Sequence, residues 1–304
     1  MNTYKGETIV AFGIDEAFAP HLAVTIASVV ANAPDANFLF LVVHDGVGIE
    51  HQRRIEQCAG PNRVQWAEIS DTRFFALKGM DHISRAAYYR LAIPVFAPPE
   101  ARRAIYLDVD IVVLGDVREL ARADLGNKPI GAVFDPGMDA GAFAIEHGLE
   151  PLPLGYFNSG MMVIDLEKIR ASHAFEHAFE VISEGRIQLR YADQCALNLV
   201  LWNQWARLDP VWNMQRRMLI DEPWEPVFAT REEMNWGRRP KLIHYTTAKK
   251  PWHKDAYHPY TWLYFRYLRR TPYWQEINQG SGTTLLQHAR RCIKANLLLF
   301  FSRA

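Results

Sequence analysis

Short apolar runs alternate with longer helical patterns through the first two thirds of the chain, and this alternation most constrains the fold. The runs are rich in β-branched and aromatic residues and lack a polar face, which is typical of strands covered on both sides. Strands separated by helices favour the α/β class, with a mainly parallel sheet between two helical layers. The pattern predicts strands at residues 8–14, 37–46, 64–69, 103–115, 129–135 and 160–166, and helices at 21–33, 49–59 and 82–98, the last broken near Pro94.

The pattern weakens after Trp212. Residues 213–240 are rich in Arg, Glu, Pro and Trp, and we predict that they are irregular. A short strand is expected at 241–246, and an aromatic, basic loop at 249–262 leads into a helix. A polar Gly-Ser linker at 278–284 then separates the last segment from the rest of the chain.

Composition places the chain among soluble globular proteins. A length of 304 residues allows one large α/β domain or two smaller ones, and 49% of the residues are hydrophobic while 22% are charged. The three cysteines lie far apart without zinc-site spacing, and their odd number argues against a disulfide framework. There is no signal-peptide pattern, and no apolar run approaches the roughly 20 residues that span a bilayer. We therefore expect a cytoplasmic location.

Charge is unevenly distributed, although the formal net charge is zero. From Gly237 to the end, 13 Lys and Arg stand against two acids. Residues 283–304 combine basic side chains with Leu, Ile and Phe and contain no acid, which is typical of an amphipathic segment at a membrane surface. We expect this segment to bind the anionic inner face of the cytoplasmic membrane peripherally, with a packed terminal helix as the alternative. No nucleic-acid partner is expected, because the basic residues form no polar patch.

Several aspartates fall at or near the carboxyl ends of predicted strands, where ligands bind in open α/β sheets. One edge of the sheet is then rich in carboxylates, as a metal–phosphate site requires. Helix caps and turns are the alternative for each residue taken alone. These residues are Asp15, Asp45, Asp108, Asp110 and Asp135.

The stretch IYLDVDIV at residues 105–112 holds the pair Asp108 and Asp110 inside an apolar run. In an extended strand both side chains point to one face, roughly 6 to 7 Å apart, and at the strand end they can bind one Mg²⁺ or Mn²⁺ ion. Three interpretations remain open on these residues alone: strand-end caps or surface salt bridges, the nucleophile motif of a haloacid-dehalogenase-type phosphatase, and the metal site of a sugar-nucleotide transferase. The phosphatase motif usually opens the first strand of its domain, whereas here about 100 residues precede it.

Further motifs accompany this pair in a fixed order: IVAFGID, FAPHLAVTIASVVANAP, HISRAAYYRL, RAIYLDVDIVV, GAVFD, YFNSGMMVIDL, YADQCALN and HYTTAKKPWH. Together they resemble the family 8 retaining glycosyltransferases, in particular the bacterial lipooligosaccharide α-galactosyltransferases, over about residues 8–275. The resemblance implies a GT-A-type, Rossmann-like fold with a mainly parallel mixed sheet and a smaller, mostly helical C-terminal region. It implies a glycosyltransferase domain at 1–277, with a nucleotide-sugar half to about 135 and a sugar and acceptor half from 136, followed by the linker and basic segment at 278–304.

The resemblance also assigns a metal site. In the family the two D-x-D carboxylates and a distant histidine bind Mn²⁺, and the matching residues are Asp108, Asp110 and His244. An imidazole among carboxylates shifts the preference from Mg²⁺, the alternative ion, towards Mn²⁺. Lys250 matches the lysine that contacts the donor diphosphate. Thr247 stands where relatives have a glycine whose backbone N–H approaches a phosphate, and it has less conformational freedom than glycine.

Two more residues match donor contacts of the family. Asp15 matches the aspartate that reads the uracil end of UDP, and Arg90 matches an arginine near the donor sugar and phosphate. Glu16 and Ala17 replace the Asp and Asn that usually follow at this point.

The sugar pocket of the family matches Asp135, Asn158, Asp193 and Gln194. Gln194 matches the residue below the anomeric carbon, and because an amide is a poor nucleophile, a same-face displacement fits better than a covalent intermediate. Asp193 is the local candidate for the covalent route, and that choice stays open. The implied function is transfer of galactose or glucose from a UDP-hexose to a saccharide or glycolipid acceptor, in lipopolysaccharide or surface glycan synthesis. The phosphatase and a non-catalytic sugar-nucleotide-binding scaffold are the alternatives.

Overall fold

The computed structural model describes residues 5–77, 84–185, 190–220, 226–235, 239–254, 256, 258–280, 287, 289, 290, 293 and 297. The strands are β1 (Thr8–Ile14), β2 (Phe38–His44), β3 (Arg63–Glu68), β4 (Arg103–Leu107), β5 (Ile111–Val113), β6 (Ile130–Phe134), β7 (Phe157–Asp165), β8 (Trp205–Arg207), β9 (Met214–Gln215) and β10 (Leu242–His244). The α-helices are α1 (Ala19–Asn32), α2 (Ile49–Ala59), α3 (Thr72–Ala76), α4 (Ile93–Phe96), α5 (Arg118–Ala121), α6 (Ala140–Glu146), α7 (Leu166–Ser172), α8 (Ala174–Glu184), α9 (Ala192–Val200), α10 (Thr261–Leu268) and α11 (Trp274–Gly280). Short 3₁₀ helices are η1 (Glu16–Phe18), η2 (Arg85–Ala92), η3 (Pro210–Trp212) and η4 (Arg216–Met218).

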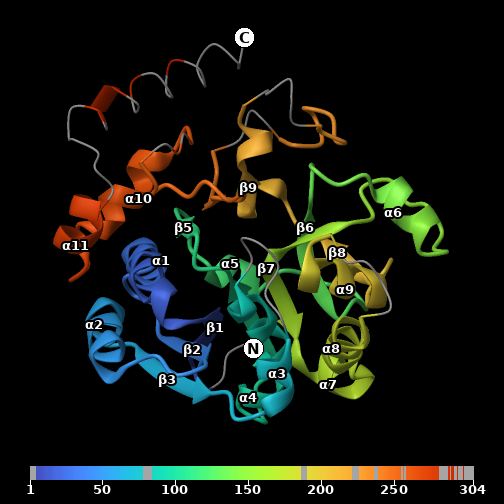
Figure 1. The fold of residues 1–304 in the computed structure, drawn as a ribbon, viewed down its shortest axis with the longest axis horizontal. Helices are drawn as coiled ribbons and strands as arrows, with labels where there is room; N and C mark the ends of the chain where they lie inside the picture. The colour runs from blue at the N-terminus through green and yellow to red at the C-terminus, as the bar shows by residue number, and fades with distance from the viewer. Residues whose placement is uncertain are drawn as a thin grey trace.

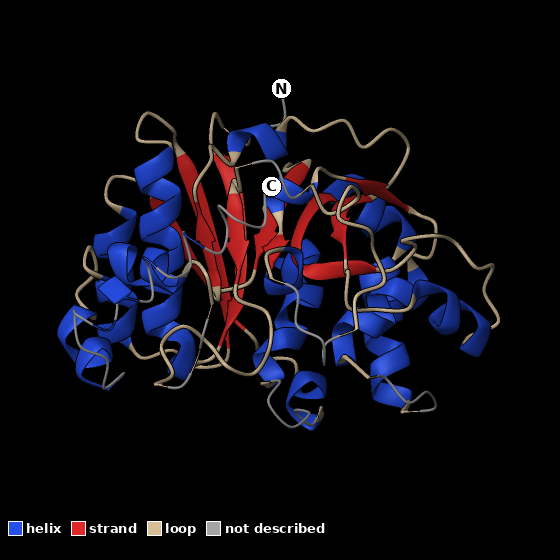
Figure 2. Ribbon diagram, turned by 90° about the horizontal axis from the view of Figure 1, so that it is seen from above, coloured by secondary structure: helices blue, strands red, loops and turns tan. Residues whose placement is uncertain are grey.

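The main sheet has seven strands in the order β3-β2-β1-β4-β7-β6-β8. Strand β1 runs parallel to β2 and β4, β2 is parallel to β3, and β6 is parallel to β8, whereas β7 is antiparallel to both β4 and β6. Helices lie on either side of the strands (Figure 2), and α10 and α11 lie beside α1 and α2 (Figure 1). The predicted fold class is confirmed: a mixed, mainly parallel sheet is flanked by helices, with a helical C-terminal region.

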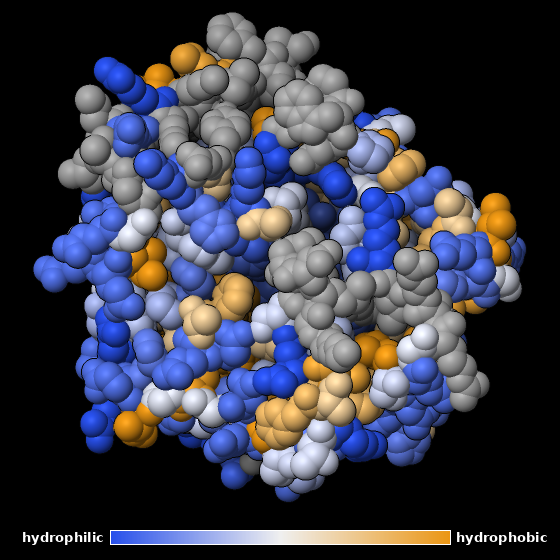
Figure 3. All heavy atoms as spheres, viewed as in Figure 1, coloured by the Kyte–Doolittle hydropathy of each residue, from blue (hydrophilic) through white to orange (hydrophobic). Residues whose placement is uncertain are grey.

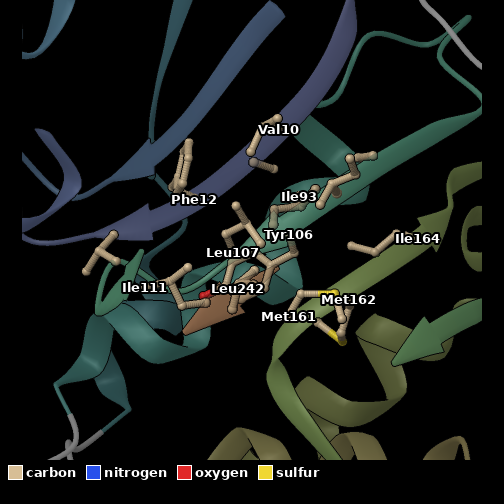
Figure 4. Packing of buried hydrophobic residues seen from close by; sticks show 14 of the residues in the cluster. Val10, Phe12, Ile93, Tyr106, Leu107, Ile111, Met161, Met162, Ile164 and Leu242 are labelled. Atoms are coloured by element: carbon tan, nitrogen blue, oxygen red, sulfur yellow. The ribbon is translucent and has the colours of Figure 1, made fainter. Parts of the chain in front are cut away.

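The central strands form because their side chains are apolar on both faces. Every residue of β2, FLFLVVH, is buried. Where β1, β4 and β7 meet, the strand register places Val10, Phe12, Leu107 and Met161 on one face of the sheet (Figure 4). Each such side chain stabilises the fold by roughly 1.5–3 kcal/mol when it leaves water. This core fixes the strand ends from which the site residues project.

The prediction of one continuous strand at 103–115 is wrong. The structure has two strands there, β4 and β5, and the aspartate pair lies between them. Strands β4 and β5 belong to different sheets. The Asp108 N–H donates to the Gly160 carbonyl at 2.8 Å, beside β7, whereas the Asp110 carbonyl accepts from the Tyr245 N–H at 3.0 Å, beyond β10. The two aspartates therefore do not share one face of an extended strand. A bend between the two sheets brings them together.

The second sheet has three strands in the order β5-β10-β9. Strand β10 is antiparallel to β5, with His244 opposite Ile111, and parallel to β9, with His244 opposite Gln215. This register places a histidine from the last third of the sequence next to the residue that follows the aspartate pair.

Helix α1 carries a stripe of buried polar side chains that hold β5 in place. The Thr25 hydroxyl donates to the Ile111 carbonyl at 2.8 Å. The Ser28 hydroxyl accepts from the Val113 N–H at 2.9 Å, and the Asn32 amide donates to the Val113 carbonyl at 3.0 Å. The three residues follow helical spacing and therefore lie on one face of α1. This face supplies hydrogen-bond partners to the backbone of β5 on the side where no strand pairs with it.

The segment predicted as one helix at 82–98 contains two short helices of different types. The 3₁₀ helix η2 is followed directly by the single turn α4, and residues 82 and 83 lie outside the described part. Pro94 does not break the helix as predicted, because it lies in the first turn of α4, where its missing N–H costs no hydrogen bond.

The linker predicted at 278–284 is wrong for its first three residues, because residues 278–280 form the end of α11. Residues 281–284 and most of the basic segment at 283–304 lie outside the described residues, so the linker, the domain boundaries and the membrane segment stay predictions. Within the described ranges, no helix has both the length and the apolar character needed to cross a bilayer.

Replacing Thr25 with the isosteric valine tests the α1 stripe. Thr25→Val leaves buried carbonyls of the bend without their donor, which should lower the free energy of unfolding by about 1–3 kcal/mol. Urea denaturation measures the loss. The control is Ser183→Ala. This substitution removes an exposed hydroxyl that donates to the Glu180 carbonyl of its own helix at 3.0 Å. An equal effect of the two substitutions contradicts the assigned role.

Candidate active site

A cavity of about 500 Å³ opens between the main sheet and the second sheet. Figure 3 shows a hollow lined by hydrophilic side chains near the middle of the face seen in Figure 1. The structure brings together ten of the residues predicted from the sequence, which come from segments far apart in the chain. They are Arg90, Asp108, Asp110, Asp135, Asn158, Asp193, Gln194, His244, Thr247 and Lys250.

Three of these residues form a cluster with the donor set of a divalent-metal site. One ligand atom each from Asp108, Asp110 and His244 lies within 4.8 Å of the others. His244 Nε2 is 3.2 Å from Asp110 Oδ1 and 3.7 Å from Asp108 Oδ2. Two carboxylate oxygens and one imidazole nitrogen suit Mn²⁺. The residues therefore fit the ion that the sequence implies.

The remaining oxygen of each aspartate is held by a basic side chain. Asp108 Oδ1 accepts from Arg90 at 3.0 Å and from the Tyr106 hydroxyl at 2.6 Å. Asp110 Oδ2 pairs with Lys250 Nζ at 2.5 Å. Burial alone would raise the pKa of Asp110, but Lys250 and His244 together hold that pKa below its ordinary value. Asp110 is therefore ionised at neutral pH.

The orientation of His244 is fixed by a chain of amides. His244 Nδ1 lies 2.9 Å from Asn213 Oδ1, and Asn213 Nδ2 donates to Asn158 Oδ1 at 2.9 Å. An Nδ1–H that donates to Asn213 leaves the lone pair of Nε2 directed at the two aspartates, as a metal ligand requires. The same chain ties the metal cluster to a residue of the predicted sugar pocket.

Gly160 permits this close assembly. A Cβ atom at this position would lie 2.2 Å from His244 Cε1 and 2.6 Å from Asp108 Oδ2. No side chain fits there without displacing both residues. The glycine of the FNSG motif therefore serves the metal cluster.

The loop that carries Lys250 is anchored from behind by a stack of aromatic rings. Trp252 lies face to face with His21 of α1, with 3.5 Å between ring centroids and 13° between planes. His21 Nδ1 is 2.7 Å from the Tyr264 hydroxyl, and burial lowers the pKa of His21 to about 3. A neutral imidazole stacks on the indole without adding charge behind the lysine.

Thr247, in the same loop, has a backbone conformation that glycine adopts more readily than threonine. Its φ angle is +86°, in the left-handed region that β-branched residues rarely adopt. The loop holds Thr247 in this conformation at a cost in backbone strain, which is typical of functional loops.

Arg90 joins the metal cluster to the sugar side of the cavity. Its guanidinium pairs with Asp108 at 3.0 Å and with Asp193 at 2.9 Å, and it donates to the Ser159 carbonyl at 2.7 Å. Burial raises the pKa of Asp193 to about 6, although Arg90 opposes that shift. The Arg90 guanidinium thus already has partners within the protein. Its contact with the sugar-nucleotide donor stays a prediction.

The sugar side is a network of side-chain amides around one carboxylate. Asp135 Oδ2 accepts from Gln194 Nε2 at 3.1 Å and from Asn158 Nδ2 at 3.2 Å. Gln194 Oε1 accepts from the Ser159 N–H at 3.0 Å. These bonds fix which way both amides point.

Asp15 differs from the other predicted residues, because it does not line the cavity. It caps η1 by accepting from the Phe18 N–H at 3.2 Å, and it also accepts from the Ser84 hydroxyl. Its neighbours Gly13, Phe18 and Ser84 do line the cavity. The predicted uracil contact therefore places a base at the rim beside this cap.

Sequence reasoning missed three residues that shape the site: Tyr106, Ser159 and Asn213. Tyr106 lies in the motif RAIYLDVDIVV and Ser159 in the motif YFNSGMMVIDL, so their position beside predicted site residues could have identified them. Asn213 lies in a segment predicted to be irregular, where no local pattern marks a buried amide.

The chain is similar in sequence and in fold to known glycosyltransferases. Residues 9–256 match the family described as Glycosyl transferase family 8. General stress protein A of Bacillus subtilis (strain 168) is 31% identical over 271 residues, which cover 86% of this chain and 93% of that protein. The chain belongs to glycosyltransferase family 8.

Other family 8 relatives extend the likeness. The lipopolysaccharide 1,2-glucosyltransferase of Escherichia coli (strain K12) is 26% identical over 295 residues, or 93% of this chain and 83% of that protein. A crystal structure of the galactosyltransferase LgtC with donor and acceptor sugar analogues has a TM-score of 0.76, covers 89% of this chain and 100% of its own, and is 22% identical. That structure supports the GT-A fold. The predicted family is confirmed, and membership excludes the phosphatase interpretation of DVDIV.

The raised pKa of Asp193 predicts a pH-dependent stability for this family 8 enzyme. The folded carboxyl binds its proton up to about pH 6, whereas an unfolded aspartate loses it near pH 4. The stabilisation from that proton is complete below about pH 4 and disappears as the pH rises through 6. Relative to Asp193→Asn, the wild type should lose about 3 kcal/mol of unfolding free energy over this range. Urea denaturation with EDTA measures this, and a difference that does not change with pH contradicts it.

The Lys250–Asp110 pair predicts competition with a metal ion. In the absence of nucleotide, Lys250→Met should raise the affinity for Mn²⁺ roughly tenfold, because the ammonium no longer repels the ion or occupies Asp110. The same substitution should weaken UDP binding in the presence of Mn²⁺. Titration calorimetry measures both affinities. The exposed neighbour Lys249, as Lys249→Met, is the matched control, and a lower Mn²⁺ affinity of Lys250→Met overturns the argument.

Proposed function

We propose that this family 8 enzyme transfers a hexose, galactose or glucose, from its UDP derivative to a saccharide or glycolipid acceptor with retention of configuration. The observation that carries the proposal is that the Asp108–Asp110–His244 cluster and the Asp135–Gln194 network open into one cavity. A lipopolysaccharide 1,2-glucosyltransferase and a lipopolysaccharide 1,3-galactosyltransferase (Salmonella typhimurium, 26% identical over 273 residues) are among the relatives. Lipopolysaccharide or a related surface glycan is therefore the proposed acceptor class.

Asp108, Asp110 and His244 hold the divalent ion in this proposal, with Mn²⁺ preferred over Mg²⁺. When bound, such an ion neutralises negative charge on the diphosphate and so makes UDP a better leaving group. Lys250 is the donor-binding cation beside it, and the Thr247 backbone N–H faces the same phosphates. Arg90 acts on the donor through Asp108 and Asp193, which it holds in place.

The four sugar-pocket residues orient the hexose in this proposal. Asp135 and Asp193 accept from sugar hydroxyls, and Asn158 and Gln194 fix the orientation of Asp135. Gln194 Oε1 is occupied by the Ser159 N–H, and Asp193 is paired with Arg90 at 2.9 Å. Both engagements weaken these oxygens as nucleophiles, which favours the same-face displacement over a covalent intermediate.

The organisation of the chain follows the same proposal. Residues 1–277 form the glycosyltransferase domain, with the nucleotide-sugar half to about 135 and the sugar and acceptor half from 136. Residues 278–304 attach it to the anionic inner face of the cytoplasmic membrane. In that segment the described side chains of Ile293 and Leu297 are exposed, four residues apart on a helical spacing.

Release of UDP from UDP-galactose and UDP-glucose, measured with Mn²⁺ or EDTA, tests the function. The wild type should release UDP in a metal-dependent reaction, and Asp110→Ala should reduce the rate by more than about 100-fold, because a ligand and the partner of Lys250 are lost. Asp124→Ala, at an exposed carboxyl outside the cavity, should have no effect.

Two results would contradict the proposal in different ways. Tight UDP binding by the wild type without turnover of either donor would favour the non-catalytic scaffold. Release of UDP that is equally fast in EDTA would remove the metal site from the reaction.

A further inference from the structure

A second cavity of about 380 Å³ adjoins the candidate active site. It lies between the start of α6, the turn at residues 151–154 and Phe228. Figure 1 shows α6 projecting at the edge of the sugar half, away from α10 and α11. Asp135 lines both cavities, so the two adjoin at this residue.

The walls of the second cavity are held in place from several sides. The Phe228 N–H donates to the Pro136 carbonyl at 2.7 Å, which fixes its segment against the loop after β6. The Trp202 indole donates to the Glu150 carbonyl at 2.9 Å on the opposite wall. Leu154 has a φ angle of +51°, a conformation that costs a leucine strain and that surrounding structure must impose. This groove is therefore preformed.

Its lining combines apolar surfaces with carboxylates. Met138, Leu152, Leu154, Tyr156 and Phe228 supply apolar contact, and the Phe228 side chain is 46% exposed. Asp135 and Asp139 supply hydrogen-bond acceptors at two points. A pyranose ring has the matching chemistry, with an apolar C–H face and hydroxyl donors around its edge. An alkyl chain would displace water from these carboxylates without offering them a hydrogen-bond donor.

We propose that this groove binds a sugar residue of the acceptor next to the one that is glycosylated. The proposal rests on the proposed function and deepens it: the acceptor is an oligosaccharide of at least two residues. The attacked hydroxyl lies in the first cavity beside Asp135, and the neighbouring sugar stacks on Phe228 in the second. Binding energy from this remote residue then helps to position the reacting one.

Two substitutions perturb the groove in opposite ways. Phe228→Ala removes the exposed aromatic surface. Gly141→Trp fills the groove from α6, and the backbone tolerates a side chain there, because a Cβ would meet only Asp139 Oδ1 at 3.4 Å. Ile145→Ala is the control, since Ile145 is 73% exposed on the same helix and does not line the groove.

The assay measures UDP release with Mn²⁺ and the better donor, alone and with three kinds of acceptor. These are methyl glucosides and galactosides as monosaccharides, octyl glucoside as an alkyl glycoside, and lactose, maltose, melibiose and deacylated lipopolysaccharide core as oligosaccharides. In the wild type an oligosaccharide should have at least a roughly tenfold higher kcat/KM than any methyl glycoside. Both variants should remove most of that advantage while the rate without acceptor, and Ile145→Ala, stay unchanged.

The outcomes separate this inference from the function on which it rests. Loss of donor turnover altogether is a failure of the proposed function, and it shows in the acceptor-free arm. Equal use of monosaccharides and oligosaccharides by the wild type overturns the groove. So do an advantage confined to octyl glucoside, no transfer to any acceptor of the panel, or variants that keep the full oligosaccharide advantage.

Discussion

The hydrogen bonds from α1 to β5 are the constraint on which the rest of the site depends. The chain leaves the main sheet at Asp108, and the backbone that follows has β10 on one side only. Thr25, the first residue of the α1 stripe, has its hydroxyl within 3.0 Å of both the Val109 and the Ile111 carbonyls. Without such donors the bend would bury unsatisfied carbonyls at a cost of about 1–3 kcal/mol each. The polar face of α1 thus permits the bend that brings Asp108 and Asp110 together as candidate metal ligands.

Charge compensation explains why three acids can lie in so apolar a setting. Buried carboxylates are costly unless they are paired and hydrogen-bonded. Arg90 links Asp108 with Asp193, while Lys250 and His244 share Asp110. Each D-x-D carboxylate gives one oxygen to a basic side chain and turns the other towards His244. The arrangement keeps the ligand atoms of the two aspartates directed at one point.

The sequence allowed the family, the sheet and most of the residues around the cavity to be predicted, because the motifs are local and their order is preserved. It did not allow the path of residues 103–115 to be predicted, since an apolar run with two aspartates has the same local pattern whether or not it bends. What decides is a partner on α1, distant in sequence. Asn213 was missed for the same reason. At Thr247 the sequence showed a residue where the family usually has glycine, but it did not show the φ angle of +86° that the loop imposes on this threonine.

In the proposed function, recognition of the donor and recognition of the acceptor meet at Asp135, which lines both cavities. Its carboxylate is held by Gln194, Asn158 and the Gly137 N–H, at 2.9–3.2 Å, so it moves little relative to β6 and β7. Asn158 is in turn connected through Asn213 to His244. A sugar that bonds to Asp135 is therefore positioned against the same rigid network that orients the metal cluster. If the two substrates meet on one face, as we propose, binding both to one rigid network reduces the entropy that must be lost at the transition state. The amides of Asn158 and Gln194 then serve alignment, which demands no nucleophilic chemistry from either.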